Sequence, residues 1–468
     1  PFVGSKTRHV RGAIPYCQYA CQYILREMRH EEHEAQDRVT ELGTGGGIAK
    51  GFSLSEGGGF SFVGGKFLLA HEDRETLKDC AEYFQGKCMQ DVGDAFWKSS
   101  YPQAAYIEKG WQAVLYTAPH DPAPEGRLVL DFETALKLGL QGLLDHLRGK
   151  ISSASVTDYA SAEKIYFWRG CARVLEATIA WARRHAAKAR ELAAAEQDPS
   201  RKEELLALAD RCHRVPAEPP RNFRDAMQAF WFLYLAGHIE GSHLGYSPGR
   251  FDRYMYPYFQ KDFTSGTLSE AEALELLEAL RVKMTEIEYV ASFSWEGLGS
   301  GNLFQNMILG GIDEHGRRGD NALSLLVLQA AINCQTTQPT LSIWYDDSLG
   351  EEFLLKALEC VKTGCGFPAW FNLKVFIQHE LEKGIVPLGT IRTYAAMGGC
   401  TEPILEGMSH GIVQAGFINH GKLLELALNG GTDPQTGLTF TSTEIPTTYG
   451  ELLEAYKIHM KDAIGAWQ

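Results

Sequence analysis

The sequence of 468 residues contains no apolar run near the roughly 20 residues needed to cross a bilayer. Its longest apolar stretch, Phe230 to Gly237, predicts a buried helix of about two turns. The ten cysteines lack the spacing of a small disulfide scaffold, which indicates reduced thiols in a cytoplasmic protein. Positive charge is scarce, with 45 Lys and Arg against 59 Asp and Glu. The net charge of −14 disfavours nucleic acid and anionic membranes as partners.

Three short patterns each lack one element of a cofactor site. Gly43–Gly47 has no clear strand before it and no helix opening on it, as a dinucleotide site requires. Gly59–Lys66 has glycine where a phosphate-binding loop needs lysine. Cys17 and Cys21 have the first spacing of a radical-SAM cluster, but Ile24 stands in the third cysteine position. The sequence therefore predicts no bound metal or nucleotide cofactor.

The chain does contain a series of helical patterns, followed by β-prone runs that alternate with helices. Ser269 with Glu272 forms a capping box that opens one of these helices. Predicted helices cover residues 131–150, 158–196, 199–213, 222–239, 269–287, 321–333, 351–363 and 451–467, and predicted strands cover 306–310, 340–345 and 369–371. Strand–helix alternation predicts an α/β core with helices outside it, and the lack of repeats or linkers favours one domain.

One segment, residues 397–403, combines a thiol, a carboxylate and two glycines. Cys400 and Glu402 are two positions apart, and Pro403 favours extended backbone at Glu402, so both side chains are expected to share one side. This pairing suits hydrogen-atom transfer at sulfur coupled to proton transfer at oxygen. A nucleophilic cysteine would instead need a histidine or cation, because a nearby carboxylate raises the thiol pKa. The alternative interpretation is an inert cysteine buried in a glycine-rich turn.

The segment resembles the thiyl loop of glycyl radical enzymes, the pyruvate formate-lyase-like superfamily. Further stretches of the chain resemble the same family and follow one another in the same order. The family's Gly-Cys-x-Glu-Pro pattern matches residues 399–403. The other matching stretches lie at residues 246–252, 256–258, 303–306, 310–311, 338–342, 366–372, 422–426 and 429–430. With the helical region that begins at Asp131, they span roughly two thirds of the chain.

The resemblance implies a ten-stranded α/β barrel, built from two antiparallel five-stranded halves and surrounded by helices. Cys400 would sit on a finger loop inside the barrel, pass its hydrogen to a backbone glycyl radical and then take one from the substrate. Glu402 would act as general base or acid. The resemblance also implies a small-molecule substrate, a separate radical-SAM activase that installs the radical, and a homodimer in an anaerobe.

One family feature, a C-terminal Arg-Val-x-Gly-Tyr-like motif that carries the radical glycine, is missing from the sequence. The chain begins with Pro1 and stops at Gln468 within an apparent amphipathic helix. We therefore expect residues 1–468 to be an N-terminal portion, cut at both ends, without the glycyl radical domain. A catalytically dead scaffold relative is the alternative.

The residues around the thiyl loop favour the lyase branches of the family. Gly399 replaces the second cysteine of pyruvate formate-lyase, so a formate acetyltransferase is disfavoured. Gln414 stands where diol dehydratases have aspartate, and Leu244-Gly245 replaces their His-Ser pair. Dehydratases, C–N lyases, C–S lyases and arylacetate decarboxylases remain open, with a formate C-acetyltransferase-like enzyme as a further alternative.

Gln414 is predicted to bind substrate, together with Arg127, Tyr246 and Phe304. Arg127 lies where dehydratases often have histidine and would grip a carboxylate bidentately, unless it is an exposed surface arginine. This arginine favours an organic acid as substrate, with decarboxylation as one possible reaction. Tyr246 and Phe304 are predicted pocket walls, and core packing is the alternative for both.

Overall fold

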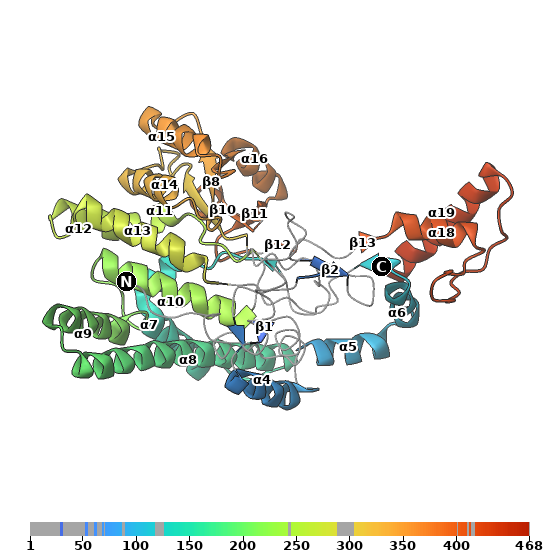
Figure 1. Cartoon of the computed structure of the whole chain (residues 1–468), viewed down its shortest axis with the longest axis horizontal. Coiled ribbons are helices and arrows are strands. Elements are labelled where there is room, and N and C mark those ends of the chain that lie inside the picture. Colours follow the sequence, from blue (N-terminus) through green and yellow to red (C-terminus); the bar gives the residue numbers. More distant parts are fainter. Residues whose placement is uncertain are drawn as a thin grey trace, which may run out of the picture. The chain divides into compact units, whose positions relative to one another are not determined.

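The structure is a computed structural model, and the chain forms two compact units in it (Figure 1). Unit 1 contains the described residues from 126 to 411, and unit 2 those before residue 118 and after residue 411. The described residues are 29–30, 52–54, 60–62, 68–69, 71–86, 89–117, 126–241, 245–287, 304–399, 401–409, 411–412 and 417–467. Gly43–Gly47, Cys17 and Cys21 lie outside them. In these parts of the chain no helix is long and apolar enough to cross a membrane.

Unit 1 is built on parallel β-structure. Strands β7 (Asn306–Gly310), β8 (Thr340–Tyr345) and β9 (Ala369–Asn372) form a parallel sheet in that order. Two parallel bridges extend it, because Gly249 pairs with Met307 and Leu128 pairs with Tyr246. Five segments therefore run parallel, in the order 126–128, 246–249, β7, β8 and β9. This arrangement matches one five-stranded half of the expected barrel.

A hairpin follows the parallel strands. Strand β10 (Ala395–Gly398) pairs antiparallel with β11 (Glu402–Leu405), and Gly398 lies opposite Glu402. The indole Nε1 of Trp344, in β8, donates to the carbonyl of Ala395 at 3.0 Å. The hairpin is thus attached to the sheet where β10 begins.

The helices of unit 1 include the seven predicted from the sequence, which start and end close to the predicted residues, and four short helices that were not predicted, at residues 251–254, 256–264, 373–383 and 388–394. They are α7 (Phe132–Ser153), α8 (Tyr159–Ala195), α9 (Pro199–Arg214), α10 (Phe223–Gly241), α11 (Phe251–Tyr254), α12 (Tyr256–Thr264), α13 (Glu270–Met284), α14 (Ala322–Cys334), α15 (Glu351–Lys362), α16 (Leu373–Lys383) and α17 (Leu388–Tyr394). The predicted capping box of Ser269 and Glu272 is confirmed. Asp131, Asp158 and Asp198 cap α7, α8 and α9 through their carboxylates.

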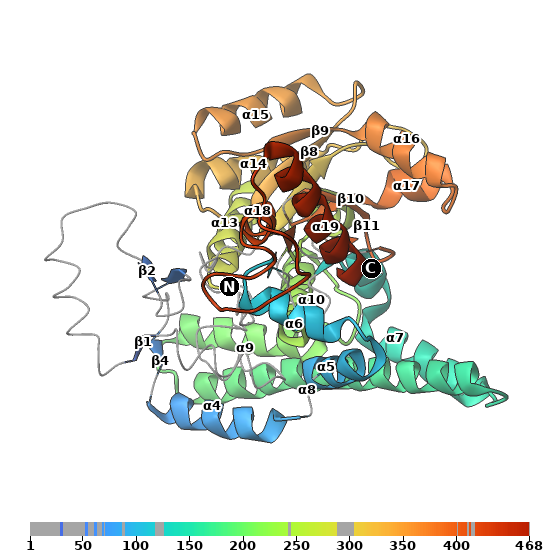
Figure 2. The same ribbon diagram turned by 90° about the vertical axis from the view of Figure 1, so that its right-hand side faces the viewer.

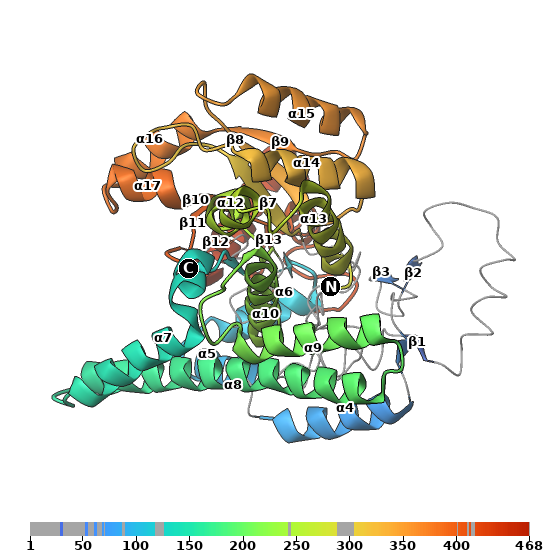
Figure 3. The same ribbon diagram turned by 90° about the vertical axis from the view of Figure 1, so that its left-hand side faces the viewer.

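These helices cover the strands in groups. Helices α14 and α15 lie together beside β8 and β9, with α16 and α17 on the other side (Figure 2). Helix α9 runs along one half of the long helix α8, and α7 along the other (Figure 3). Helix α10 packs against all three. Its side chains Phe230, Trp231, Phe232 and Tyr234 are fully buried, as the apolar stretch predicted.

Unit 2 is mostly helical and has its own small core. Its elements are β1 (Arg29–His30), β2 (Phe52–Leu54), β3 (Phe60–Phe62), β4 (Leu68–Leu69), α4 (His71–Phe84), α5 (Met89–Ser100), α6 (Ala104–Gln112), β5 (Tyr116–Thr117), β13 (Phe417–Ile418), α18 (His420–Leu428) and α19 (Tyr449–Trp467), and β12 (Gly411–Ile412) lies where the units join in sequence. Strands β5 and β13 pair antiparallel. Leu115, Tyr116, Leu423 and Leu426 form the core, and the Tyr116 hydroxyl donates to the carbonyl of Ala463 at 2.8 Å.

Candidate active site

The hairpin of β10 and β11 turns tightly around position 400. The Thr401 amide donates to the carbonyl of Gly398 at 3.2 Å. Gly399 and Thr401 both have positive φ, 56° and 93°. Cys400 itself lies outside the described residues. The expectation of extended backbone leading into Glu402 is therefore wrong at Thr401, because the chain reverses direction there to form the hairpin.

Arg127 lies beside Glu402. Its Nε atom is 3.4 Å from Oε2 of Glu402, and the two side chains are 4% and 22% exposed. The alternative interpretation of Arg127 as an exposed surface arginine is thus excluded. A buried guanidinium needs a nearby negative charge to offset its lost hydration, and Glu402 supplies one.

Three glycines make room for the arginine side chain. A Cβ atom at Gly245 would lie 2.1 Å from Cδ of Arg127, and one at Gly399 would lie 2.4 Å from the same atom. At Gly398 a Cβ would lie 2.6 Å from Cβ of Arg127. Real Cβ atoms do not approach this closely, so any other residue at these positions would displace Arg127. The two glycines before Cys400 thus allow the hairpin to reach Arg127.

Ser247 connects the hairpin to the parallel strands through its hydroxyl. The amides of Gly399 and Asn306 donate to Ser247 Oγ at 2.9 and 3.0 Å. The hydroxyl in turn donates to the carbonyl of Gly245 at 3.1 Å. The Ser247 amide donates to the carbonyl of Leu128 at 2.9 Å. One fully buried serine therefore connects its own segment to three others that meet near position 400.

The far end of the hairpin is held by an ion-pair network. Glu406 accepts hydrogen bonds from the amide of Arg250 and from the guanidinium of Arg253, the latter at 3.0 Å. Arg253 also pairs with Glu133 of α7. Burial raises the pKa of Glu406, although Arg253 acts against this shift. For Arg253, burial lowers the pKa but the carboxylates of Glu406 and Glu133 outweigh it, so its pKa is raised.

Two other residues of the 246–252 stretch fix the strand ends. The guanidinium of Arg250 donates to four backbone carbonyls, those of Arg392, Thr393, Gly310 and Ile312. The Asp252 carboxylate accepts from the Gly310 amide at 2.8 Å and the Ser324 hydroxyl at 2.6 Å. Burial raises the pKa of Asp252 to about 6. These contacts are structural, and they position the strand ends around the hairpin.

The remaining predicted site residues lie in different surroundings. Tyr246 is fully buried, with its ring stacked on Tyr234 at 4.9 Å and edge-on to His238 at 4.7 Å. Burial raises the pKa of Tyr246 well above its usual range. Phe304 is partly exposed, directly before β7, with a positive φ of 51°. Gln414 lies outside the described residues.

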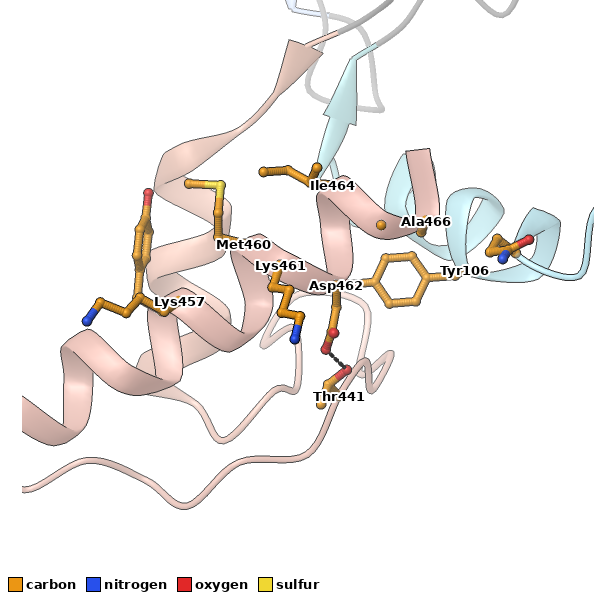
Figure 4. Close-up of a pocket in the computed structure, with 11 residues that line it drawn as sticks. Tyr106, Thr441, Lys457, Met460, Lys461, Asp462, Ile464 and Ala466 are labelled. Carbon is orange, nitrogen blue, oxygen red and sulfur yellow. Dashed lines mark hydrogen bonds between the residues drawn. The ribbon is translucent and has the colours of Figure 1, made fainter. Parts of the chain in front are cut away.

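A separate hollow of about 1070 Å³ opens on unit 2 (Figure 4). Residues of α6, α19 and the segment before α19 line it, and Thr441 donates to Asp462 there at 2.5 Å. None of the predicted site residues that the structure describes lines this hollow. Its lysines, Lys457 and Lys461, lie on α19, and Lys457 is paired with Glu454. We therefore take the hairpin region, rather than this hollow, as the candidate active site.

Comparison with known proteins decides the family. The pyruvate formate lyase-like family pattern matches residues 1–466. The chain belongs to this family of glycyl radical enzymes, in its lyase branch. Residues 399–403, which resemble a thiyl loop, thus lie in a chain that matches the family over nearly its whole length.

Individual relatives agree with this assignment. The chain is 36% identical over 440 residues to indoleacetate decarboxylase of Tractidigestivibacter scatoligenes, covering 93% of this chain and 49% of that protein. It is 30% identical over 503 residues to the 4-hydroxyphenylacetate decarboxylase glycyl radical subunit of Clostridioides difficile, covering 99% and 54%. The chain spans about half the length of these relatives.

Solved structures support the predicted barrel fold of glycyl radical enzymes. A structure described by 1,2-propanediol dehydration in Roseburia inulinivorans superposes with a TM-score of 0.72 at 29% identity, covering 86% of this chain and 50% of that one. The glycerol-bound B12-independent glycerol dehydratase of Clostridium butyricum gives the same score at 25% identity, covering 99% and 64%.

Sequence reasoning missed the hairpin's supports, namely Ser247, Arg250, Arg253 and Glu406. Three of the four lie at residues 247–253, next to or within a stretch already matched to the family. A buried Ser, Arg and Asp in one short stretch signal a structural hydrogen-bond centre, since such groups are buried only with partners. What they bind could not be read from their spacing.

Proposed function

We propose that this chain forms the thiyl-bearing part of a glycyl radical lyase that decarboxylates a small arylacetic acid. The observation that carries the proposal is a buried cation, Arg127, lying 3.4 Å from Glu402 beside the turn at position 400. A substrate carboxylate would be attracted to the same cation, because a guanidinium offers several donors to planar carboxylates. The relatives named as indoleacetate and 4-hydroxyphenylacetate decarboxylases support this substrate class.

The protein's own groups have distinct tasks in this proposal. A backbone glycyl radical, installed by a radical-SAM activase, supplies the unpaired electron. Cys400 gives its hydrogen atom to that radical and becomes the group that reacts with substrate. Decarboxylation consumes one proton overall, since a carboxylate and a proton give carbon dioxide and a C–H bond. In this proposal Glu402 delivers that proton and becomes negatively charged as the substrate carboxylate leaves as carbon dioxide, so Arg127 keeps one negatively charged partner.

A diol dehydratase is the second candidate within the family, and the packing around Arg127 disfavours it. Dehydratases carry histidine and serine where this chain has Arg127 and Gly245. A serine Cβ at position 245 would lie 2.1 Å from Cδ of Arg127, so the arginine in this position requires glycine at 245. The two departures from the dehydratase pattern are therefore one structural change, which adds a positive charge where diols need none.

The finer features follow from the family resemblance and stay predictions. They are a homodimer, a cytoplasmic location in an anaerobe, and a radical glycine outside residues 1–468. Tyr246, Phe304 and Gln414 are proposed to shape the substrate pocket. A catalytically dead relative that keeps only the fold remains the alternative to an active enzyme.

The test uses the full-length gene product, activated anaerobically with its radical-SAM activase. We expect a glycyl radical signal by electron paramagnetic resonance, and ¹³CO₂ release from carboxyl-labelled arylacetates. Conversion of 1,2-diols to aldehydes without carbon dioxide release would show that the enzyme is a diol dehydratase and not a decarboxylase. A product with no radical signal and no turnover would favour the dead relative.

A further inference from the structure

The Ser247 hydroxyl uses every hydrogen bond that a serine side chain can make. A hydroxyl has one proton to donate and two lone pairs to accept with. The proton goes to the carbonyl of Gly245 at 3.1 Å, with the carbonyl of Phe304 as a second, longer acceptor at 3.4 Å, and the lone pairs accept the amides of Gly399 and Asn306. The residue is 0% exposed, so water does not compete for these bonds. Loss of the hydroxyl would leave two buried amides without an acceptor.

Ser247 differs from the other supports of the hairpin in the residue that it binds. Trp344 holds the hairpin at Ala395, where β10 begins, and Arg253 holds it at Glu406, after β11. Among the described contacts between the hairpin and other segments, the hydrogen bond from the Gly399 amide to Ser247 Oγ lies nearest in sequence to Cys400, one residue before it. The hydroxyl therefore acts on the turn, and the other supports act on the ends.

We propose that Ser247 is a positioning residue that fixes the turn at Cys400 relative to the parallel strands. The inference rests on the proposed function, in which the thiol must meet both the glycyl radical and the substrate. A hydrogen-atom transfer depends steeply on the separation of its reacting atoms, so a turn that moves by a fraction of an ångström slows the reaction. Ser247 holds the turn through the backbone of Gly399 and does not itself contact the substrate.

The variant that tests this inference is Ser247→Ala, with Ser324→Ala as its matched control. Ser324 is also 0% exposed and donates its hydroxyl to a buried partner, Asp252, at 2.6 Å. Its hydrogen bonds in the described part of the chain go to Asn321 and Asp252, so it reproduces the general cost of losing a buried hydroxyl. Ser247→Thr keeps the hydroxyl and serves as the conservative variant.

Hydrogen–deuterium exchange on the chain gives the first readout. In Ser247→Ala the Gly399 amide should exchange about tenfold faster or more, since its acceptor is lost. The Glu406 amide, which donates to the carbonyl of Tyr394 at 2.8 Å, should keep its rate. Ser324→Ala should leave the Gly399 amide unchanged. Equal acceleration of both amides in Ser247→Ala, or no acceleration, would overturn the positioning role.

Turnover by the activated full-length enzyme gives the second readout. Ser247→Ala should lower kcat about tenfold with KM and the glycyl radical yield nearly unchanged, and Ser247→Thr should restore most of kcat. An unchanged kcat despite faster Gly399 exchange would overturn the catalytic importance of the turn while leaving the proposed function standing. Absence of turnover in the unmodified enzyme would count against the proposed function, and the exchange result would still decide whether Ser247 holds the turn.

Discussion

The Nε atom of Arg127 lies 3.4 Å from Oε2 of Glu402, and three glycines enclose the arginine side chain. The pair brings together residues 275 positions apart in the sequence, from β6 (Gly126–Arg127) and from β11. It places the Arg127 guanidinium next to the turn that contains Cys400, the residue proposed to carry the thiyl radical. The predictions below test this relationship and the supports around it.

Replacing Arg127 should selectively impair turnover of carboxylate substrates. In the full-length enzyme we expect Arg127→Ala to lower kcat/KM for an arylacetate by about 100-fold, because a charge-assisted hydrogen bond in a buried site contributes about 1.5–3 kcal/mol. Steady-state kinetics on activated enzyme measures this. Arg148→Ala, at an exposed pair with Glu176, is the control and should change little. Normal arylacetate turnover by Arg127→Ala would contradict the proposed role.

Gly245→Ala should destabilise the protein through a clash with Arg127. The new Cβ would lie 2.1 Å from Cδ of Arg127, and Gly245 has a φ of +82°, so we expect a loss of about 2–5 kcal/mol in the free energy of unfolding. Gly266→Ala is a matched control, with a φ of +72° and no atom within 4 Å of the new Cβ. It should cost only the strain of about 1 kcal/mol.

The double variant Gly245→Ala with Arg127→Ala separates the clash from the backbone strain. Urea denaturation of the four proteins in this cycle should give a favourable interaction energy between the two substitutions, since removal of the arginine side chain relieves the clash. Additive losses would show that Arg127 does not fill the space beside Gly245.

Breaking the buried pair at the end of the hairpin should cost more than breaking a surface pair. Glu406→Ala removes the partner of the Arg250 amide and of one side of the Arg253 guanidinium. We expect a loss of about 3–5 kcal/mol in the free energy of unfolding, as for other buried pairs that lose one member. Glu176→Ala, which breaks the exposed pair with Arg148, should cost at most about 1 kcal/mol. Similar losses in both variants would show that Glu406 is not a principal support.

Asp252 should make stability fall as pH rises. Burial raises its pKa to about 6 from the usual 3.8, so the folded protein holds this proton more tightly than the unfolded chain does. The resulting stability is fully present below about pH 4 and is lost as pH rises through about 6, an effect of the order of 3 kcal/mol. Urea denaturation between pH 4 and pH 7.5 measures it. Asp252→Asn should remove this part of the slope, and an identical slope in both proteins would contradict the shifted pKa.

Most local elements of unit 1 were predictable from the sequence because their signals are local. The strands at 306–310 and 340–345 match β7 and β8 residue for residue, and the capping box at Ser269 is present. Helix spacing, caps and β-prone runs depend on neighbouring residues, so they can be read along the chain. The motif at residues 399–403, and the ordered stretches around it, likewise indicated the family.

The arrangement of the site was decided only by the tertiary structure. Nothing local to Arg127 indicates that Gly245, Gly398 and Gly399 enclose it, because each lies more than 100 residues away. The backbone at Thr401 was predicted to be extended, because Pro403 favours extended backbone in the residue before it. That preference applies only to Glu402, however, and the pairing of β10 with β11 requires the chain to turn at Thr401. Ser247 binds Gly399 across 152 residues. The sequence by itself determined which groups are present and which helices and strands they form. Burial in one parallel-stranded core determined which of them meet.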